Sequence, residues 1–260
     1  MTQLVRFELI AGNIGLITLT RPEAANAMSV QLLNELGATL DKVNGDPTVR
    51  VVLLTGTGQK AFCAGADLKE RKGMSDRQVK QIVQLIGATV TKVEALAQPV
   101  IAVLNGVAFG GGLELALACD LRVAAAHTQL GLTETSLGII PGAGGTQRLP
   151  RLIGIGKAKE LIYTARRLNA VEAKEYGIVE YVFDGHELQE KAQQLALEMA
   201  KNAPLSLMQA KIAMNQGVEV DLATGLKIES LAYCALIPTE DRLEGLLAFQ
   251  EKRSPQYSGQ

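Results

Sequence analysis

Two apolar runs constrain the fold more than any other feature of the chain. RVVLLTG (50–56) and VIAVL (100–104) are short, rich in β-branched residues and free of polar alternation, which is typical of strands buried on both faces. A segment with helical spacing of its apolar residues lies between them, from about residue 75 to 97. Because strands that alternate with helices form parallel β/α units, the sequence predicts an α/β fold.

The flanking segments extend this prediction. Alternating apolar residues from Val5 to Leu9, a turn at 11–13 and the run IGLITLT indicate a β-hairpin. Ser29 is expected to cap a helix that ends at Gly45, and LRVAAA (121–126) is a further strand. After about residue 186 only helical spacing remains, and it predicts a helical C-terminal region with helices at 188–201, 204–216, 222–236 and 239–252.

Composition excludes several classes of protein. Of 260 residues, 47% are hydrophobic and 20% are charged, and the net charge is -1, so a polyanion is not expected as the main partner. No apolar stretch is long enough for a membrane span, and the N-terminus lacks a secretory signal pattern. Three scattered cysteines without a CxxC pair argue against a disulfide framework or a zinc site. We expect a cytoplasmic protein, or a mitochondrial matrix protein if a targeting segment has been removed.

The segment NGVAFGGGLELALACD (105–120) places three glycines between a predicted strand and a predicted helix. The first turn of a helix has unpaired N–H donors, and glycine allows a ligand to approach them closely. Glu114 would lie in that turn, in apolar surroundings. The alternative is that the glycines only permit close helix–strand packing. The pattern is not GxGxxG, so we do not expect a dinucleotide site.

Two other segments favour a catalytic site. AFCAGADLKE (61–70) supplies a second turn of small residues, and LGLTETSLGIIPGAGGTQRLPR (130–151) supplies a second carboxylate, Glu134, and a rigid PGAGG loop. Two carboxylates beside glycine-rich turns suit acid/base chemistry on one small group. The alternative for Glu134 is a solvated carboxylate at a strand end.

Together these three motifs resemble the enoyl-CoA hydratase/isomerase (crotonase) superfamily, and the resemblance extends from RPEAANAM (21–28) to LLAFQEKR (246–253). It implies an α/β fold built as a crotonase-type spiral of repeated β-β-α units with a helical C-terminal region. On this basis we expect a spiral core with the CoA and catalytic sites at 1–195 and a helical trimerisation region at 196–260. It also implies a homo-trimer or a hexamer built as a dimer of trimers.

The resemblance further implies the site. Backbone N–H groups of Ala66 and Gly111 would form an oxyanion hole for an acyl-CoA thioester, and Glu114 and Glu134 would be the catalytic pair. Two glutamates favour an enoyl-CoA hydratase, a hydro-lyase of fatty-acid β-oxidation that adds water to a 2-enoyl-CoA. Glu114 would deprotonate the water and Glu134 would serve the proton at Cα, although either could hold the water. No cofactor and no metal are expected, because the thioester is the electron sink.

The resemblance also implies contacts to CoA. They comprise the loop after the first motif, the first glycine of the triplet, a stretch near the pantetheine and phosphates, and an aromatic–lysine set that comes from a neighbouring subunit in some members. These residues are Ala64, Ala66, Asp67, Leu68, Gly110, Arg21, Ala25, Tyr233, Phe249 and Lys252. Core packing is the alternative for Phe249, and a surface charge for Lys252. His127 and His186 are expected to be structural or exposed, and Cys63, Cys119 and Cys234 to be small buried hydrophobes rather than nucleophiles.

Several stretches, among them FCAGADLKER and MNQGVEVDLATGL, resemble the methylglutaconyl-CoA hydratase branch, which includes a protein that binds AU-rich RNA. The matching helix here carries only Arg77, Lys80 and Lys92 and no interleaved aromatics, so we do not expect nucleic-acid binding. The alternatives left open are methylglutaconyl-CoA hydration in leucine degradation, enoyl-CoA isomerisation and an RNA-binding side activity. A cation for a distal carboxylate would come from Arg71, Lys72 or Arg77.

Overall fold

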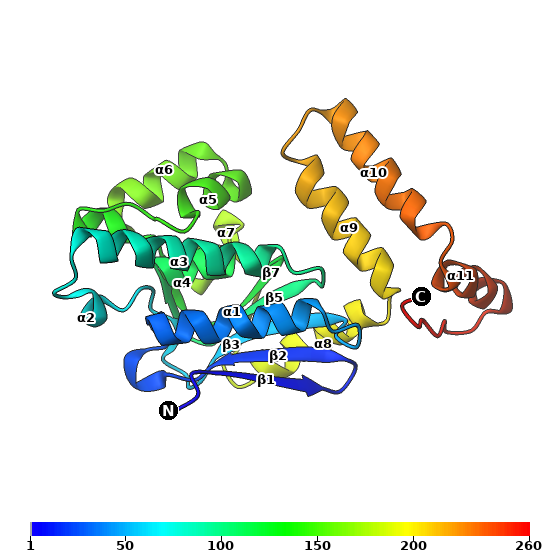
Figure 1. The fold of residues 1–260 in the computed structure, drawn as a ribbon, viewed down its shortest axis with the longest axis horizontal. Helices are drawn as coiled ribbons and strands as arrows, with labels where there is room; N and C mark the ends of the chain where they lie inside the picture. Colours follow the sequence, from blue (N-terminus) through cyan, green and yellow to red (C-terminus); the bar gives the residue numbers. More distant parts are fainter. Residues whose placement is uncertain (1) are drawn as a thin grey trace.

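The computed structural model describes residues 2–260, which form two β-sheets surrounded by helices (Figure 1). The larger sheet has six strands in the order β1-β2-β3-β5-β7-β10, and the smaller has four in the order β4-β6-β8-β9. Apart from the antiparallel pairs β1–β2 and β8–β9, neighbouring strands run parallel. The strands are β1 (Val5–Ile10), β2 (Ile14–Leu19), β3 (Val51–Gly56), β4 (Ala61–Cys63), β5 (Val100–Leu104), β6 (Val107–Phe109), β7 (Leu121–Ala125), β8 (Gln129–Gly131), β9 (Leu168–Asn169) and β10 (Tyr181–Phe183).

The helices agree closely with the apolar spacing in the sequence. Ser29 Oγ accepts a hydrogen bond from Leu32 N (3.2 Å) and caps α1, which ends before Gly45 as predicted. The helical elements are η1 (Pro22–Ala24), α1 (Val30–Asn44), α2 (Leu68–Arg71), α3 (Asp76–Glu94), α4 (Gly111–Leu117), η2 (Glu134–Leu137), α5 (Gly145–Ile153), α6 (Ile155–Thr164), α7 (Ala170–Tyr176), α8 (Leu188–Ala200), α9 (Pro204–Gly217), α10 (Leu222–Leu236) and α11 (Glu240–Glu251).

Helices cover both faces of the large sheet, which explains why its central strands are continuously apolar. In β3, Val52 and Leu54 belong to the core that includes α1 and α3, whereas Val51 and Leu53 belong to the core formed with α8. Every residue of β3 and β5 is buried. The confirmed prediction of buried parallel strands therefore follows from a layered arrangement in which neither face meets water.

The chain alternates between the two sheets. After β3, β5 and β7 in the large sheet come β4, β6 and β8 in the small one, each followed by a helical segment. This is the predicted spiral of β-β-α units. Because β4 and β6 are parallel neighbours (Ala61 opposite Val107), the turns that follow them leave the same edge of the small sheet. That edge is where the site is formed.

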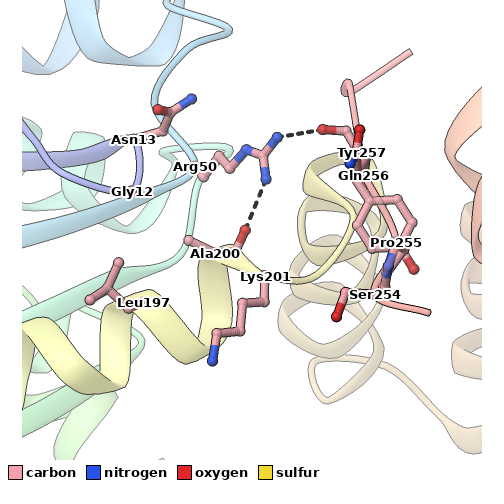
Figure 2. A pocket seen from close by; sticks show the side chains of 10 residues that line it. All are labelled: Gly12, Asn13, Arg50, Leu197, Ala200, Lys201, Ser254, Pro255, Gln256 and Tyr257. Atoms are coloured by element: carbon pink, nitrogen blue, oxygen red, sulfur yellow. Dashed lines mark hydrogen bonds between the residues drawn. The ribbon is translucent and has the colours of Figure 1, made fainter.

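The C-terminal helices extend away from this core. In Figure 1, α9 and α10 (yellow to orange) pack against each other to one side, with α11 (red) beyond them. Buried Lys211 of α9 donates hydrogen bonds to Gln98 O (3.0 Å) and Asp120 Oδ2 (2.8 Å). Figure 2 shows a second attachment, in which Arg50 donates to Ala200 O and to Tyr257 O of the C-terminal tail.

The predicted boundary between residues 195 and 196 lies within α8, and the division into two domains stays a prediction. Across residues 2–260, no helix combines the length and the apolar character that a membrane crossing requires.

Candidate active site

The turns that follow β4 and β6 pack backbone against backbone. A Cβ at Gly112 would lie 1.9 Å from Cys63 O, and a Cβ at Gly65 would lie 2.7 Å from Phe109 O. No side chain fits at either position without moving the other turn. The small residues of the CAGAD and GGG motifs are therefore required for the two turns to meet.

This contact brings two unused N–H groups together. Ala66 forms a parallel bridge with Met28, but the flanking residues make its hydrogen bonds: Met28 N donates to Gly65 O (2.8 Å) and Asp67 N donates to Met28 O (3.1 Å). Gly111 is the first residue of α4, so its N–H has no partner within the helix. Across residues 2–260 neither N–H donates to a protein acceptor. A Cβ at Gly111 would lie 3.7 Å from Ala66 N, so the two donors are close neighbours.

Glu114 lies in the first turn of α4 and is 2% exposed. Its Oε1 accepts hydrogen bonds from Ala143 N (2.7 Å) and Gly145 N (2.8 Å). Gly145 begins α5, so the partial positive charge at the start of that helix faces the carboxylate. Burial raises the pKa of Glu114 overall, although these two N–H groups and nearby Arg148 lower it in part. The carboxylate is thus buried but supplied with donors.

Glu134 lies against the first glycine of the triplet, Gly110. It opens η2 and is 9% exposed, and its Oε1 is close to Gly110, where a Cβ would approach it to 3.1 Å. Its Oε2 is buried and has no hydrogen-bond partner among the described residues. Burial raises the pKa of Glu134 to about 7, and the charge of Glu114 adds to the effect. Glu134 is therefore not the solvated strand-end carboxylate of the alternative interpretation.

Both carboxylates and both free amides line one cavity of about 830 Å³. Its wall includes apolar side chains from α3 and from the segment around η2, namely Val79, Val83, Ile86, Leu137, Ile139 and Ile140. Two cations, Arg71 and Arg167, also line it, and the Arg167 guanidinium lies 4.7 Å from the centre of the Phe109 ring. The cavity can hold an apolar chain next to an oxyanion site and two acid/base groups.

The predicted CoA contacts fall into three groups. Ala64, Leu68 and Gly110 line the cavity beside the proposed oxyanion hole and catalytic residues. The second group, Arg21, Ala25 and Asp67, does not line it, although Ala25 O accepts a hydrogen bond from Ala64 N (3.0 Å).

Arg21 and Asp67 bind each other. Arg21 Nη1 lies 2.6 Å from Asp67 Oδ2, and Asp67 Oδ1 caps α2 by accepting from Lys69 N and Glu70 N. Burial alone would raise the pKa of Asp67, but the Arg21 hydrogen bond and these amides lower it overall. The pair holds the loop of the first motif in place.

The third group comprises Tyr233, Phe249 and Lys252, none of which lines the cavity of its own chain. Phe249 is 87% exposed and Tyr233 is 66% exposed. Core packing of Phe249 is therefore wrong for this chain on its own. Their role in CoA binding stays a prediction.

The donors to Glu114 are not evident from the sequence. Ala143 and Gly145 belong to the PGAGG loop, which the sequence predicts to be rigid, but nothing local in the sequence links that loop to a side chain on α4. Arg167 is likewise not evident from the sequence, since an arginine in a mostly polar segment carries no distinguishing signal.

The histidines, cysteines and potential metal ligands lie away from the cavity lining. His127 Nε2 bonds to Gln59 O (3.0 Å) and Asn105 O (3.2 Å), as expected for a structural histidine. Burial raises the pKa of the Cys63 and Cys119 thiols to about 12, so both stay protonated. The expectation that Cys234 is buried is wrong for this chain on its own, because Cys234 lies exposed on α10. In residues 2–260 a metal-type cluster is formed by Asp184, His186 and Glu187, at the surface. That no metal or cofactor takes part stays a prediction.

We expect Glu134→Gln to stabilise the fold at alkaline but not at acidic pH. Folding raises the pKa of Glu134 from the ordinary 4.5 to about 7, so ionisation costs folding free energy that grows as the pH rises between these values. Glutamine removes that cost, and the gain in the free energy of unfolding should reach up to about 3 kcal/mol near pH 8 and vanish near pH 4. Urea unfolding at the two pH values measures it.

The matched control is Glu198→Gln, because Glu198 is exposed and its side chain makes no hydrogen bond or ion pair within residues 2–260. It should show no pH-dependent gain. An equal gain for Glu134→Gln at both pH values would contradict the burial of an ionisable, unpartnered carboxylate.

Known proteins resemble this chain in sequence and in fold. A sequence model of the family described as enoyl-CoA hydratase/isomerase matches residues 10–260. YngF of Bacillus subtilis, named for this family, is 58% identical over 247 residues, or 95% of both chains. Human mitochondrial methylglutaconyl-CoA hydratase is 48% identical over 254 residues, which is 95% of this chain and 75% of the human protein. The crystal structure of enoyl-CoA hydratase from Bacillus anthracis gives a TM-score of 0.98 at 55% identity and covers 99% of this chain and 100% of that one. The chain therefore belongs to the enoyl-CoA hydratase/isomerase family and has the crotonase fold.

Proposed function

We propose that this protein is an enoyl-CoA hydratase, a hydro-lyase that adds water to the 2,3 double bond of a 2-enoyl-CoA thioester and forms a 3-hydroxyacyl-CoA. The single observation that carries the proposal is the convergence, in one cavity, of two unpaired N–H groups with two buried carboxylates. Membership of the family and the similarity to an enoyl-CoA hydratase from Bacillus anthracis support it.

The two N–H groups bind the thioester oxygen. Ala66 N and Gly111 N donate to this oxygen, which gains negative charge when a nucleophile adds at Cβ. Donors that are already oriented and shielded from water stabilise such charge, and the loss of one typically costs about 3–4 kcal/mol of transition-state stabilisation. Because the glycines let the two turns meet, they also bring together the two donors that polarise the thioester and make Cβ electrophilic.

The carboxylates move the two protons of the addition. Glu114 accepts a proton from the water as the water oxygen bonds to Cβ. Glu134 then donates a proton to Cα of the enolate, which restores the thioester carbonyl. Hydrogen bonds from Ala143 N and Gly145 N favour the anionic form of Glu114, which suits a base. A pKa of about 7 keeps Glu134 partly protonated near neutral pH, which suits an acid. The unpartnered Glu134 Oε2 leaves an acceptor free for the substrate water.

Glu114→Gln and Glu134→Gln should each lower kcat for hydration of crotonyl-CoA by about 10²–10⁴-fold, because each removes one proton-transfer group and keeps its shape. The decrease in absorbance of the enoyl thioester measures hydration. Glu198→Gln on the surface should leave kcat unchanged.

If both variants hydrated at the wild-type rate, the proposed roles would be wrong. Migration of the double bond from the 3- to the 2-position without hydration by the wild-type protein would instead identify an isomerase, the alternative activity in the family.

We further propose a carboxylated, branched acyl group as the preferred substrate, as in methylglutaconyl-CoA, for which the human relative is named. Of the three candidate cations for a distal carboxylate, Lys72 and Arg77 are exposed and do not line the cavity, whereas Arg71 does. Arg71 Nε is buried and has no acceptor among the described residues. A buried donor without a partner is costly, and an anionic acyl terminus would supply the missing acceptor.

The test compares 3-methylglutaconyl-CoA with 3-methylcrotonyl-CoA, which carries hydrogen in place of the terminal carboxylate. Arg71→Gln should lower kcat/KM for the first by about 10–100-fold, the value of a charge-assisted hydrogen bond, and leave the second within about twofold. Arg77→Gln controls for the loss of a nearby positive charge. Equal losses for both substrates would mean that Arg71 binds a group they share, such as a CoA phosphate.

We propose that the chain assembles as a homo-trimer or a dimer of trimers. Its C-terminal helices expose large apolar side chains, among them Leu222, Leu226, Leu231, Tyr233, Leu246 and Phe249, and monomeric proteins rarely expose so many together. A neighbouring copy that covers this surface would bring Phe249 and Lys252 within reach of its CoA.

Sedimentation velocity should therefore detect a trimer or hexamer, and Phe249→Asp should shift the population toward smaller species. Ser254→Asp, a change to the same charge in the exposed tail, serves as the control. A wild-type monomer at micromolar concentration would contradict the assembly.

We place the activity in a reducing compartment, the cytoplasm or the mitochondrial matrix, in keeping with two buried free thiols and one exposed free thiol. The expectation that nucleic acid is not a partner stays a proposal. It is supported by the ion pair of Lys92 with Asp41 (2.6 Å), because this pair already neutralises one of the three cations of α3 that could contact a phosphate.

A further inference from the structure

The turn at 141–145 connects Glu114 to an arginine that the proposed mechanism does not use. Within this turn, Ala143 N donates to Glu114 Oε1 (2.7 Å), while Ala143 O accepts from Arg148 Nη1 (2.9 Å). The N–H group of Ala143 is thus bound to the proposed base, and its carbonyl group is bound to Arg148. Any displacement of the turn would move the donors that orient Glu114.

Arg148 is itself held from the opposite side. Its Nε donates to Glu94 Oε1 (3.0 Å) and its Nη2 donates to Glu94 Oε2 (2.6 Å), a two-point ion pair with the last residue of α3. The Arg148 side chain is 16% exposed. A bidentate arginine–carboxylate pair fixes orientation as well as distance, so the guanidinium is a rigid support between α3 and the turn.

The turn leaves space for this guanidinium. Gly144 has φ of 102°, a left-handed conformation, and a Cβ there would lie 2.1 Å from Arg148 Nη1. Glycine at this position therefore allows the turn to wrap closely around the side chain. The PGAGG motif and Arg148, three residues after its end, form one structural unit.

Arg148 does not line the cavity, so it does not touch the acyl group there. Its positive charge nevertheless favours the ionised form of Glu114. The elements packed against α4 are α3, α5, β4 and β6, and their titratable or charged groups are Asp76, Arg77, Lys80, Lys92 and Glu94 of α3, Arg148 and Arg151 of α5, and Cys63 of β4. Glu134 of η2, Arg71 and Arg167 lie with Glu114 on the cavity wall. Of these, Arg148 alone is bonded to the turn that holds Glu114.

We propose that Arg148 is a positioning residue for the base: anchored by Glu94, it fixes the 141–145 turn so that Ala143 N and Gly145 N point at Glu114 Oε1. The inference rests on the proposed function for its kinetic consequence and on the observed contacts for its structural one. It assigns a role in hydration to an ion pair outside the cavity.

The test is the pH profile of crotonyl-CoA hydration for Arg148→Gln, Arg148→Lys and Glu94→Gln. Arg148→Gln should lower kcat by about 10–100-fold, as for a displaced catalytic group, with KM within about twofold. The acidic limb of the kcat profile should move to higher pH, because Glu114 loses both the nearby cation and its fixed donors. Arg148→Lys keeps the charge but loses the two-point hydrogen bonding of the guanidinium, so its acidic limb should move less than that of Arg148→Gln. Glu94→Gln should lower kcat less than Arg148→Gln does.

Arg151→Gln is the matched control. Arg151 lies one turn further along α5 in an exposed ion pair with Glu219 (2.8 Å), so its loss removes the same charge from the same helix without touching the turn. Its kcat and pH profile should match the wild type. If the folded Arg148→Gln or Arg148→Lys protein kept the wild-type kcat and pH profile, Arg148 would be merely structural and the proposal would fail.

Amide hydrogen exchange provides a readout that does not need turnover. The Ala143 and Gly145 amides should exchange at least about tenfold faster in Arg148→Gln than in the wild type and in Arg151→Gln. A wild-type protein that does not hydrate crotonyl-CoA would overturn the proposed function, and unchanged exchange would overturn the positioning role. Should Arg148→Gln fail to fold, Arg148→Lys and Glu94→Gln carry the same comparison.

Discussion

The close approach of two peptide turns is the constraint on which the rest of the site depends. Pairing of β4 with β6 brings the turns together, and the missing side chain at Gly112 lets its backbone approach Cys63 O. Ala66 and Gly111 then present amides that neither sheet nor helix can use. The large sheet and its two helical layers provide the rigid support that keeps these donors unpaired and oriented. The unmade hydrogen bonds cost free energy, which the proposed oxyanion would recover on binding.

The two carboxylates are buried to a similar extent but differ in what surrounds them. Glu114 receives two amide hydrogen bonds at the start of α5, whereas Glu134 Oε2 receives none. Burial raises the pKa of both, but Glu114 has two amide donors from the 141–145 turn and Arg148 nearby, whereas Glu134 has only its own backbone amide. An environment that separates two otherwise equal acids in this way favours a proton acceptor at one and a proton donor at the other.

The sequence predicted what depends on local pattern. The unbroken apolar runs predicted β3 and β5, and Ser29 and Gly45 predicted the limits of α1. The predicted bounds of the C-terminal helices match the observed ones within two residues. The resemblance supplied Ala66, Gly111, Glu114 and Glu134, which the structure brings to one cavity. The pairing of Arg148 with Glu94 and the choice of Arg71 over Lys72 depend on how helices pack, which no local pattern encodes. In the proposed assembly, the positions of Tyr233 and Phe249 relative to CoA depend on a second copy of the chain, which the sequence of one chain does not describe.

Helix α3 connects the two ends of the site. Its face toward the cavity supplies Val79, Val83 and Ile86 to the wall for the acyl group, and its last residue, Glu94, holds Arg148. Since packed helices move as rigid units, a shift of α3 that made room for a larger acyl group would also displace the support of the 141–145 turn. In the proposed mechanism, the fit of the acyl group and the orientation of Glu114 therefore depend on the placement of one helix. A substrate that packs well against α3 would also favour the geometry in which Glu114 acts as the proposed base.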